Sequence, residues 1–297
     1  MLDKVIDWLN FGQGKQNKPI GIVLWKGKSL IDGQRIMVIA TGIFGKSTNS
    51  KTGEMIQTYI MKRDMEPMFA RRMGEDFSIC GDCKHKEQST CYVNLCHGPM
   101  PVYKAYHDNS YKDFENKDKK HFKGKYIRIG SYGDPAAVPF EVWENICKMV
   151  KGYTGYTHQW KNCDQRLKKY CMASVDSIKN YYKEYDKAQS MGWRTFRIYG
   201  SDSGEDVYDT LRENEFVCPA SKEAGVKTDC QRCNSCSGTS KNTKKCPVIL
   251  FHGDSEAMGT PWRLRRYMKL MKKIRNKKKY KRDYKAERKI FRATCKF

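Results

Sequence analysis

Thirteen cysteines are the residues of this chain whose spacing most clearly predicts chemistry. A first cysteine group, Cys80, Cys83 and Cys91, has the pattern C-x2-C-x7-C. A second cysteine group has the pattern C-x2-C-x2-C with one further cysteine on each side, and its members are Cys218, Cys230, Cys233, Cys236 and Cys246. Grouped thiols at such intervals are typical of zinc and iron–sulfur sites.

The first cysteine group is compatible with two kinds of metal site. Three thiolates from one loop can ligate three irons of a [4Fe–4S] cube and leave the fourth iron open. A structural zinc needs a fourth ligand, which Cys96 or His85 would supply. The loop comes at the start of a series of strands and helices, where a βα barrel places its active-site loops, and this favours the cluster.

The second cysteine group predicts either an auxiliary iron–sulfur cluster or a zinc knuckle. Lysines and arginines surround it, so a zinc-stabilised loop that contacts nucleic acid is also physically reasonable. Residues 218–246 show little hydrophobic periodicity. We therefore expect this segment to need a metal to become ordered, the alternative being free thiols in a flexible loop.

The charge of the chain predicts a polyanionic partner. Lys and Arg number 57 against 33 Asp and Glu, a formal net charge of +24. Seventeen of the basic residues, with only two acids, follow Trp262. A helix of this kind attracts nucleic acid, although a merely solvated helix would have the same composition. The candidate contact residues are Arg263, Arg265, Arg266, Lys269, Lys272, Lys273, Lys277, Lys278 and Lys279.

The hydrophobic pattern predicts a β-ribbon followed by alternating strands and helices. The ribbon covers residues 20–45 with its turn at 31–33. Alternation of strands and helices favours parallel strand pairing. Further strands are expected at 57–61, 125–129, 153–160, 171–175, 193–199 and 248–251, and helices at 66–74, from 101 to near 120, from 139 to a cap at Gly152, from 177 to 192, and from 261 onward.

Several segments carry a resemblance to a known family. They are the C-x2-C-x7-C-Tyr loop and the runs IRIGSYGDPAAVPFEVW, TGYTHQW, CMASVD and GWRTFRI. In this order they resemble a group of phage-encoded proteins whose layout is similar to phage members of the radical S-adenosylmethionine superfamily, where the usual cysteine spacing is C-x3-C-x2-C. The resemblance covers about residues 75–250.

The resemblance implies a [4Fe–4S] cluster on the first cysteine group and bound S-adenosylmethionine. In that superfamily the reduced cluster donates an electron to the sulfonium, and the resulting 5′-deoxyadenosyl radical abstracts hydrogen from a substrate. The turn 130–134 and the acid at 176 also have simpler interpretations, as a strand–helix connection and a helix N-terminal acid. The implied cofactor contacts are Tyr92 for the adenine, Gly130, Ser131, Gly133 and Asp134 for the amino group, and Ser174 and Asp176 for the ribose.

Together these features predict an α/β protein built on a partial parallel βα barrel of the radical S-adenosylmethionine type. The expected parts are an N-terminal β-ribbon with a short helix (1–74), a barrel-like core with the first cysteine group (75–217), a cysteine-rich metal-binding segment (218–260) and a basic helical tail (261–297).

Two functions remain open from the sequence. The first is an iron–sulfur enzyme of the radical S-adenosylmethionine type that acts on nucleic acid or nucleotides. The second is a non-enzymatic phage or plasmid protein that binds zinc and nucleic acid and keeps the barrel as a scaffold. No apolar run has the length of a membrane span, and the first residues lack a secretory signal. We therefore expect a cytoplasmic protein, in the host cytoplasm if phage-encoded, without a membrane partner.

Overall fold

The computed structural model describes residues 19–45, 49–87, 91–175, 181–199, 207–221, 224–239 and 243–250. The chain divides into two compact units, Met1–His252 and Gly253–Phe297. All described residues belong to the first unit. The expected basic helix, with its candidate contacts from Arg263 to Lys279, lies outside the described residues.

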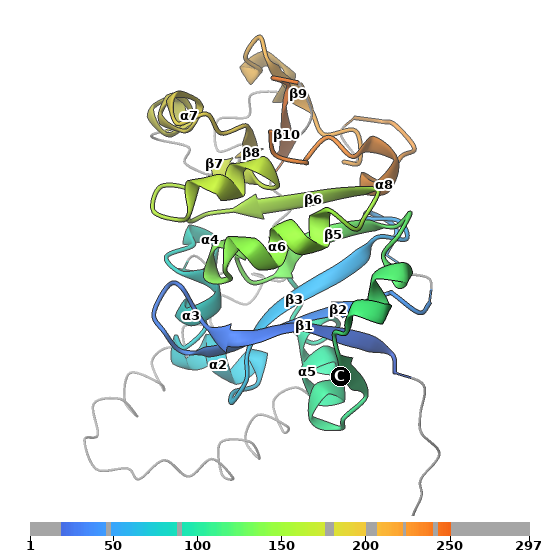
Figure 1. The fold of residues 1–297 in the computed structure, drawn as a ribbon. Coiled ribbons are helices and arrows are strands. Elements are labelled where there is room, and N and C mark those ends of the chain that lie inside the picture. Colours follow the sequence, from blue (N-terminus) through green and yellow to red (C-terminus); the bar gives the residue numbers. More distant parts are fainter. Residues whose placement is uncertain are drawn as a thin grey trace, which may run out of the picture. The chain divides into compact units, whose positions relative to one another are not determined.

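One ten-stranded mixed sheet forms the framework of the first unit, in the order β4-β1-β2-β3-β5-β6-β7-β8-β10-β9 (Figure 1). β1, β2 and β3 pair antiparallel, and every neighbouring pair from β3 to β9 is parallel, as is β4 beside β1. The predicted α/β class with mainly parallel strands is confirmed. The strands are β1 (Gly21–Lys28), β2 (Arg35–Thr41), β3 (Ile56–Lys62), β4 (Tyr111–Asp113), β5 (Tyr126–Tyr132), β6 (Gly152–Thr157), β7 (Met172–Val175), β8 (Thr195–Tyr199), β9 (Glu215–Val217) and β10 (Cys246–Leu250).

The predicted β-ribbon is confirmed as β1 and β2. Its turn contains Gly33 with a φ of +77°, a left-handed conformation that favours glycine. Gln34 N donates a hydrogen bond to Asp32 Oδ1 at 3.1 Å in the same turn. Residues Ile36 to Ala40 of β2 are completely buried. The ribbon is thus continuous with the parallel strands, because β3 pairs with β2 on one side and with β5 on the other.

Short helices occupy the connections between the parallel strands. The helix expected from residue 101 toward 120 is shorter than predicted: it ends at His107, and Asn109 has a φ of +55°. β4 and a 3₁₀ turn follow it instead. The helices are α2 (Pro67–Met73), α3 (Phe77–Cys80), α4 (Lys84–Glu87), α5 (Pro99–His107), α6 (Phe140–Cys147), α7 (Tyr181–Ser190) and α8 (Cys230–Cys233), and the 3₁₀ turns are η2 (Asn116–His121), η3 (Pro135–Ala137), η4 (Gln165–Lys169) and η5 (Val207–Thr210).

Gly152 does not end α6 as predicted. The helix stops at Cys147, and Gly152 is the first residue of β6. A Cβ at this position would lie 2.5 Å from Asn234 Nδ2 and 2.7 Å from the Tyr126 ring. The glycine therefore lets the cysteine-rich segment approach the amino end of β6.

Three tryptophans anchor the core on the parallel side of the sheet. Trp143, Trp160 and Trp193 are each at most 1% exposed. Each indole N–H also has an acceptor, as buried indoles usually do. Trp143 Nε1 donates to Pro135 O at 2.9 Å, and Trp160 Nε1 donates to Ser174 O at 3.1 Å. The second of these bonds ties the chain after β6 to β7.

Candidate metal centres

The first cysteine group lies in the connection between β3 and β5. Cys80 ends α3, and Gly81 follows with a φ of +58°, where a Cβ would lie 2.5 Å from the Gln159 side chain. Gln159 Nε2 donates a hydrogen bond to Cys80 O at 3.1 Å. Asp134 N donates one to Ile79 O at 2.6 Å. Because Asp134 follows β5 and Gln159 follows β6, the loop lies at the carboxyl ends of these parallel strands.

Cys80 lies within electrostatic range of the other two thiols of the first cysteine group. Burial raises the pKa of Cys80 well above its ordinary value. The negative charges of Asp76, Cys83 and Cys91 raise it further. Burial lowers the pKa of Arg71, but its hydrogen bond to Cys91 and the negative charge there outweigh burial and leave the pKa raised. The loop thus places a guanidinium beside a thiol that a metal would require as thiolate.

The two alternative fourth ligands lie in different surroundings. His85 belongs to α4, and its ring centroid is 5.6 Å from that of His158. Cys96 is exposed, and its Sγ lies 3.7 Å from Met68 Sδ. Cys96 is therefore a suitable position for a substitution that tests the ligand number without disturbing the core.

Asp134 connects the carboxyl ends of β5 and β6. Its Oδ1 accepts hydrogen bonds from Thr157 Oγ1 at 2.7 Å and from Ala136 N at 2.9 Å. Its Oδ2 accepts one from His158 N at 2.7 Å. Burial raises the pKa of Asp134, while the charge of His158 and these hydrogen bonds act in the opposite direction. Both carboxylate oxygens are thus engaged by donors of the protein itself.

The other predicted cofactor contacts of this region lie near the same end of the sheet. Gly130 and Gly133 have φ values of +68° and +80°. A Cβ on Gly133 would lie 2.7 Å from Ile60 Cβ, so the turn packs directly against β3. Ser131 Oγ donates a hydrogen bond to Oε1 of Gln57 in β3 at 2.7 Å. Tyr92 is 63% exposed, and its ring is accessible to a ligand.

A small cavity opens beside the first cysteine group. Cys83, His158, Gln159 and Ser174 are among its lining residues. Ser174 belongs to β7, and the histidine and glutamine follow β6, so the cavity lies at the carboxyl ends of these strands. The structure thus brings the predicted ribose contact Ser174 near Cys83. Asp176, the other predicted ribose contact, lies outside the described residues.

Four of the five thiols in the second cysteine group lie within electrostatic range of one another. Cys230 and Cys233 form the ends of α8, where the Asp229 side chain accepts a backbone hydrogen bond as N-cap. Burial raises the pKa of Cys218 to about 11, and the charges of Cys230 and Cys233 also raise it. Burial likewise raises the pKa of Cys236, and the charges of the other three thiols contribute in the same direction.

Cys246 has different surroundings from these four thiols. It is the first residue of β10 and is completely buried. Its Sγ accepts hydrogen bonds from Thr195 N at 3.4 Å and from Gln189 Nε2 at 3.5 Å. The thiol therefore packs against β8 and α7.

Helix α8, which carries Cys230 and Cys233 of the second cysteine group, lies at the opposite end of the parallel strands from the first group. Cys230 N donates a hydrogen bond to Lys51 O at 2.9 Å, shortly before β3 begins. Thr239 N donates to Lys168 O at 2.9 Å, shortly before β7 begins. In Figure 1, α8 accordingly lies near the start of β6, and α3 and α4 lie toward its arrowhead.

Neither group forms a complete coordination shell in the structure. The twelve described cysteines are free thiols. Across the described ranges, no set of three or more His, Cys, Asp or Glu side chains is arranged to hold a metal ion. The chain thus supplies thiols in two neighbourhoods, and binding would require their side chains to converge, as often happens when metal binding is coupled to ordering.

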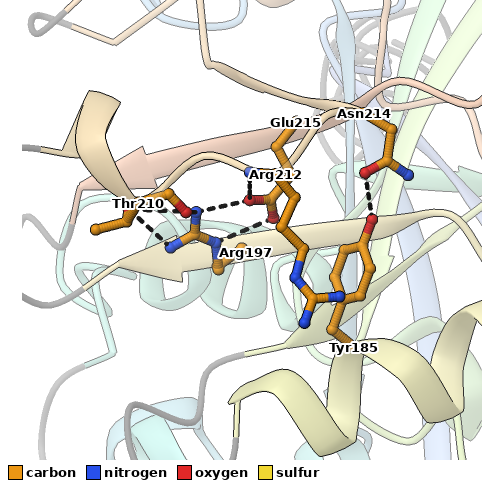
Figure 2. Close-up of polar contacts among 6 residues, drawn as sticks. All are labelled: Tyr185, Arg197, Thr210, Arg212, Asn214 and Glu215. Atoms are coloured by element: carbon orange, nitrogen blue, oxygen red, sulfur yellow. Dashed lines mark hydrogen bonds and ion pairs between the residues drawn. The ribbon is translucent and has the colours of Figure 1, made fainter.

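A buried ion pair that sequence reasoning missed positions the segment leading to the second cysteine group (Figure 2). Arg197 of β8 donates to Glu215 of β9 through Nε at 3.0 Å and Nη2 at 2.7 Å. Their side chains are 4% and 0% exposed. Nη2 also donates to Thr210 O at 3.0 Å, and Tyr185 OH of α7 donates to Asn214 Oδ1 at 2.5 Å. These bonds fix the start of β9, which the second group directly follows.

The chain matches no protein-family model, no curated protein and no solved structure. None of the helices in the described part of the chain combines the length and apolar character required to cross a membrane.

Proposed function

We propose that this protein is an iron–sulfur protein of the radical S-adenosylmethionine type that acts on nucleic acid or nucleotides. The observation that carries the proposal is the position of the first cysteine group, in the connection that follows β3 and at the carboxyl ends of the parallel strands β5 and β6. Parallel α/β sheets and barrels form their active sites at this end. A partial barrel built from β3 to β10 is the fold that accompanies this proposal.

The donor chemistry of the first cysteine group fits such a cluster. Cys80, Cys83 and Cys91 supply three thiols, and the cavity beside Cys83 leaves room for a further ligand. When bound, the cluster would supply one electron to the sulfonium of S-adenosylmethionine. Arg71 would stabilise the thiolate form of Cys91. Ser174 would offer its hydroxyl to the cofactor from the end of β7.

A structural zinc site at the second cysteine group is the second candidate. It is favoured by the four neighbouring thiols, two of which form the ends of α8 near the amino ends of β3 and β6, because this end of a barrel usually serves stability. Four thiolates are a common ligand set of structural zinc. If both groups hold zinc, we propose a non-enzymatic protein that binds nucleic acid through its basic tail. Either function requires reduced thiols, which a reducing cytoplasm maintains.

Metal analysis of anaerobically purified full-length protein tests the proposal. We expect a brown protein with iron and acid-labile sulfide, and an electron paramagnetic resonance signal after reduction that changes when S-adenosylmethionine is added. A colourless protein that contains zinc and no iron, and stays so after reconstitution with iron and sulfide, would contradict it.

Cysteine variants assign the metal to a group. Replacing Cys80, Cys83 and Cys91 together by Ala should remove the iron and leave the metal of the second group. Cys96→Ala is the matched control: a cluster with three protein ligands tolerates it, whereas a zinc site that uses this thiol does not. Unchanged iron content in the triple variant would exclude ligation by the first group.

A further inference from the structure

Arg128 is a largely enclosed cation without a carboxylate partner among the described residues. It lies in the middle of β5, where its Cα is in register with Gln57 of β3 and Thr154 of β6. Its Nη2 donates a hydrogen bond to Tyr92 OH at 2.5 Å. Its Nε is buried and has no acceptor. Guanidinium groups in such positions are normally paired, since an unpaired buried charge is costly.

Two tyrosine rings flank this guanidinium. Arg128 Cζ lies 5.8 Å from the centroid of Tyr92 and 5.9 Å from that of Tyr156. Ring faces attract cations, but they offer far weaker compensation than a carboxylate or phosphate. The Tyr156 ring packs against Phe196, with centroids 4.3 Å apart, whereas Tyr92 is 63% exposed. The site is therefore closed on one side by the sheet and open on the side of Tyr92.

Arg128 lies close to residues of both cysteine groups. Tyr92 directly follows Cys91 of the first group. The pKa of Arg128 is raised, because the electrostatic influence of Tyr92, Tyr156, Cys230 and Cys236 outweighs burial, which lowers it. An arginine stays charged at neutral pH, and this guanidinium lies between the two ends of the sheet.

We propose that Arg128 binds the anionic group, phosphate or carboxylate, of a ligand that packs against the exposed ring of Tyr92. The planar guanidinium has donors suited to two oxygens of such a group, and a tyrosine face accepts a flat ring without selecting its identity. Calling this ligand the substrate or the cofactor of a reaction rests on the function proposed above. The anion site itself requires neither the cluster nor the reaction.

Paired ligands that differ in the anionic part test this site by isothermal titration of the full-length protein. The first pair is AMP and adenosine, and the second is S-adenosylhomocysteine and its decarboxylated analogue S-adenosyl-3-thiopropylamine. We expect the member that carries the anionic group to bind about tenfold or more tightly in at least one pair, since a charge-assisted hydrogen bond has this value. A preference within the first pair identifies phosphate, and one within the second identifies carboxylate.

The variant Arg128→Met should abolish that preference and leave the thermal midpoint unchanged or higher, because it removes an unpaired enclosed charge. Arg166→Met is the matched control, since Arg166 is exposed and pairs with Asp164 and Glu141 at the surface. If Arg128→Met does not fold, Arg128→Lys keeps the charge without the planar fork and should reduce the preference.

Three results would overturn the site: no preference within either pair, a preference of unchanged size in folded Arg128→Met or Arg128→Lys, or a loss of metal from the second cysteine group with ligand binding unchanged. The last would show that Arg128 serves the thiolates instead. If the protein holds no iron but the preference depends on Arg128, the proposed function fails and the anion site stands.

Discussion

Glu215→Gln removes the negative half of the buried Arg197–Glu215 pair while it preserves the shape of the side chain. Both side chains are at most 4% exposed, so the remaining guanidinium would be left charged without access to water. Removing one partner of such a pair typically costs about 3–5 kcal/mol. For a unit of this size, that corresponds to a decrease of roughly 10 °C in the thermal midpoint.

Urea and thermal unfolding of the full chain measure this loss. Asp186→Asn is the control in the same region, because the Arg212–Asp186 pair has the same 2.7 Å separation but its aspartate is 65% exposed. The control should cost about 1 kcal/mol or less. The double variant Arg197→Met with Glu215→Leu should recover most of the stability.

The reasoning is refuted if Glu215→Gln costs no more than the control. A loss in Glu215→Gln that the double variant does not recover would also contradict it, because the cost would then come from packing rather than from an unpaired charge. We further expect Glu215→Gln to lose metal from the second cysteine group faster in the presence of a chelator, since β9 leads directly into that group.

Three further predictions concern other parts of the chain. Asp134→Ala should lower the free energy of unfolding by roughly 3 kcal/mol in urea titrations, because three hydrogen-bond donors lose their acceptor. A loss below about 1 kcal/mol would show that these hydrogen bonds do not stabilise the connection between β5 and β6. Burial raises the pKa of Asp118, but hydrogen bonds from Lys112 Nζ and Glu115 N outweigh it and hold the pKa below its ordinary value. Its contribution to stability should therefore be present at neutral pH and lost as the pH falls below about 4, so that Asp118→Asn and the unmodified protein converge in acid unfolding curves. Truncation after Asn276 removes ten Lys and Arg residues and should weaken nucleic-acid binding. The slope of the logarithm of the binding constant against the logarithm of salt concentration should become shallower by about 0.7–0.9 for each phosphate contact that is lost. An unchanged slope would place the binding surface elsewhere.

Local sequence patterns predicted the strands well, and their limits have physical causes. The runs that became β1, β2, β5 and β8 are rich in β-branched and aromatic residues, so their own composition indicated strands. β4 and β9 have three residues each, which is too short to show an alternating pattern. Their places in the sheet depend on partners elsewhere in the chain. The sequence around them therefore contained no signal for either strand.

The candidate sites show the same division between local and distant information. Cysteine spacing indicated two groups, because the members of each group are close in the chain. It did not separate Cys246 from the other thiols, since that depends on the packing of β10 against β8 and α7. Arg128 gave no signal in the sequence, because its importance lies in the absence of a carboxylate partner near it in the part of the chain that the structure describes.

The order of the last three strands has a consequence for synthesis of the chain. β10 lies between β8 and β9 in the sheet, although β9 comes before it in the sequence. While the ribosome makes this protein, β9 has no neighbour to pair with until residues 246–250 have emerged. The Arg197–Glu215 bond spans the place that β10 will fill. Completion of this edge is therefore a late, concerted event, and a nascent chain arrested before β10 would expose the side of β8 to aggregation.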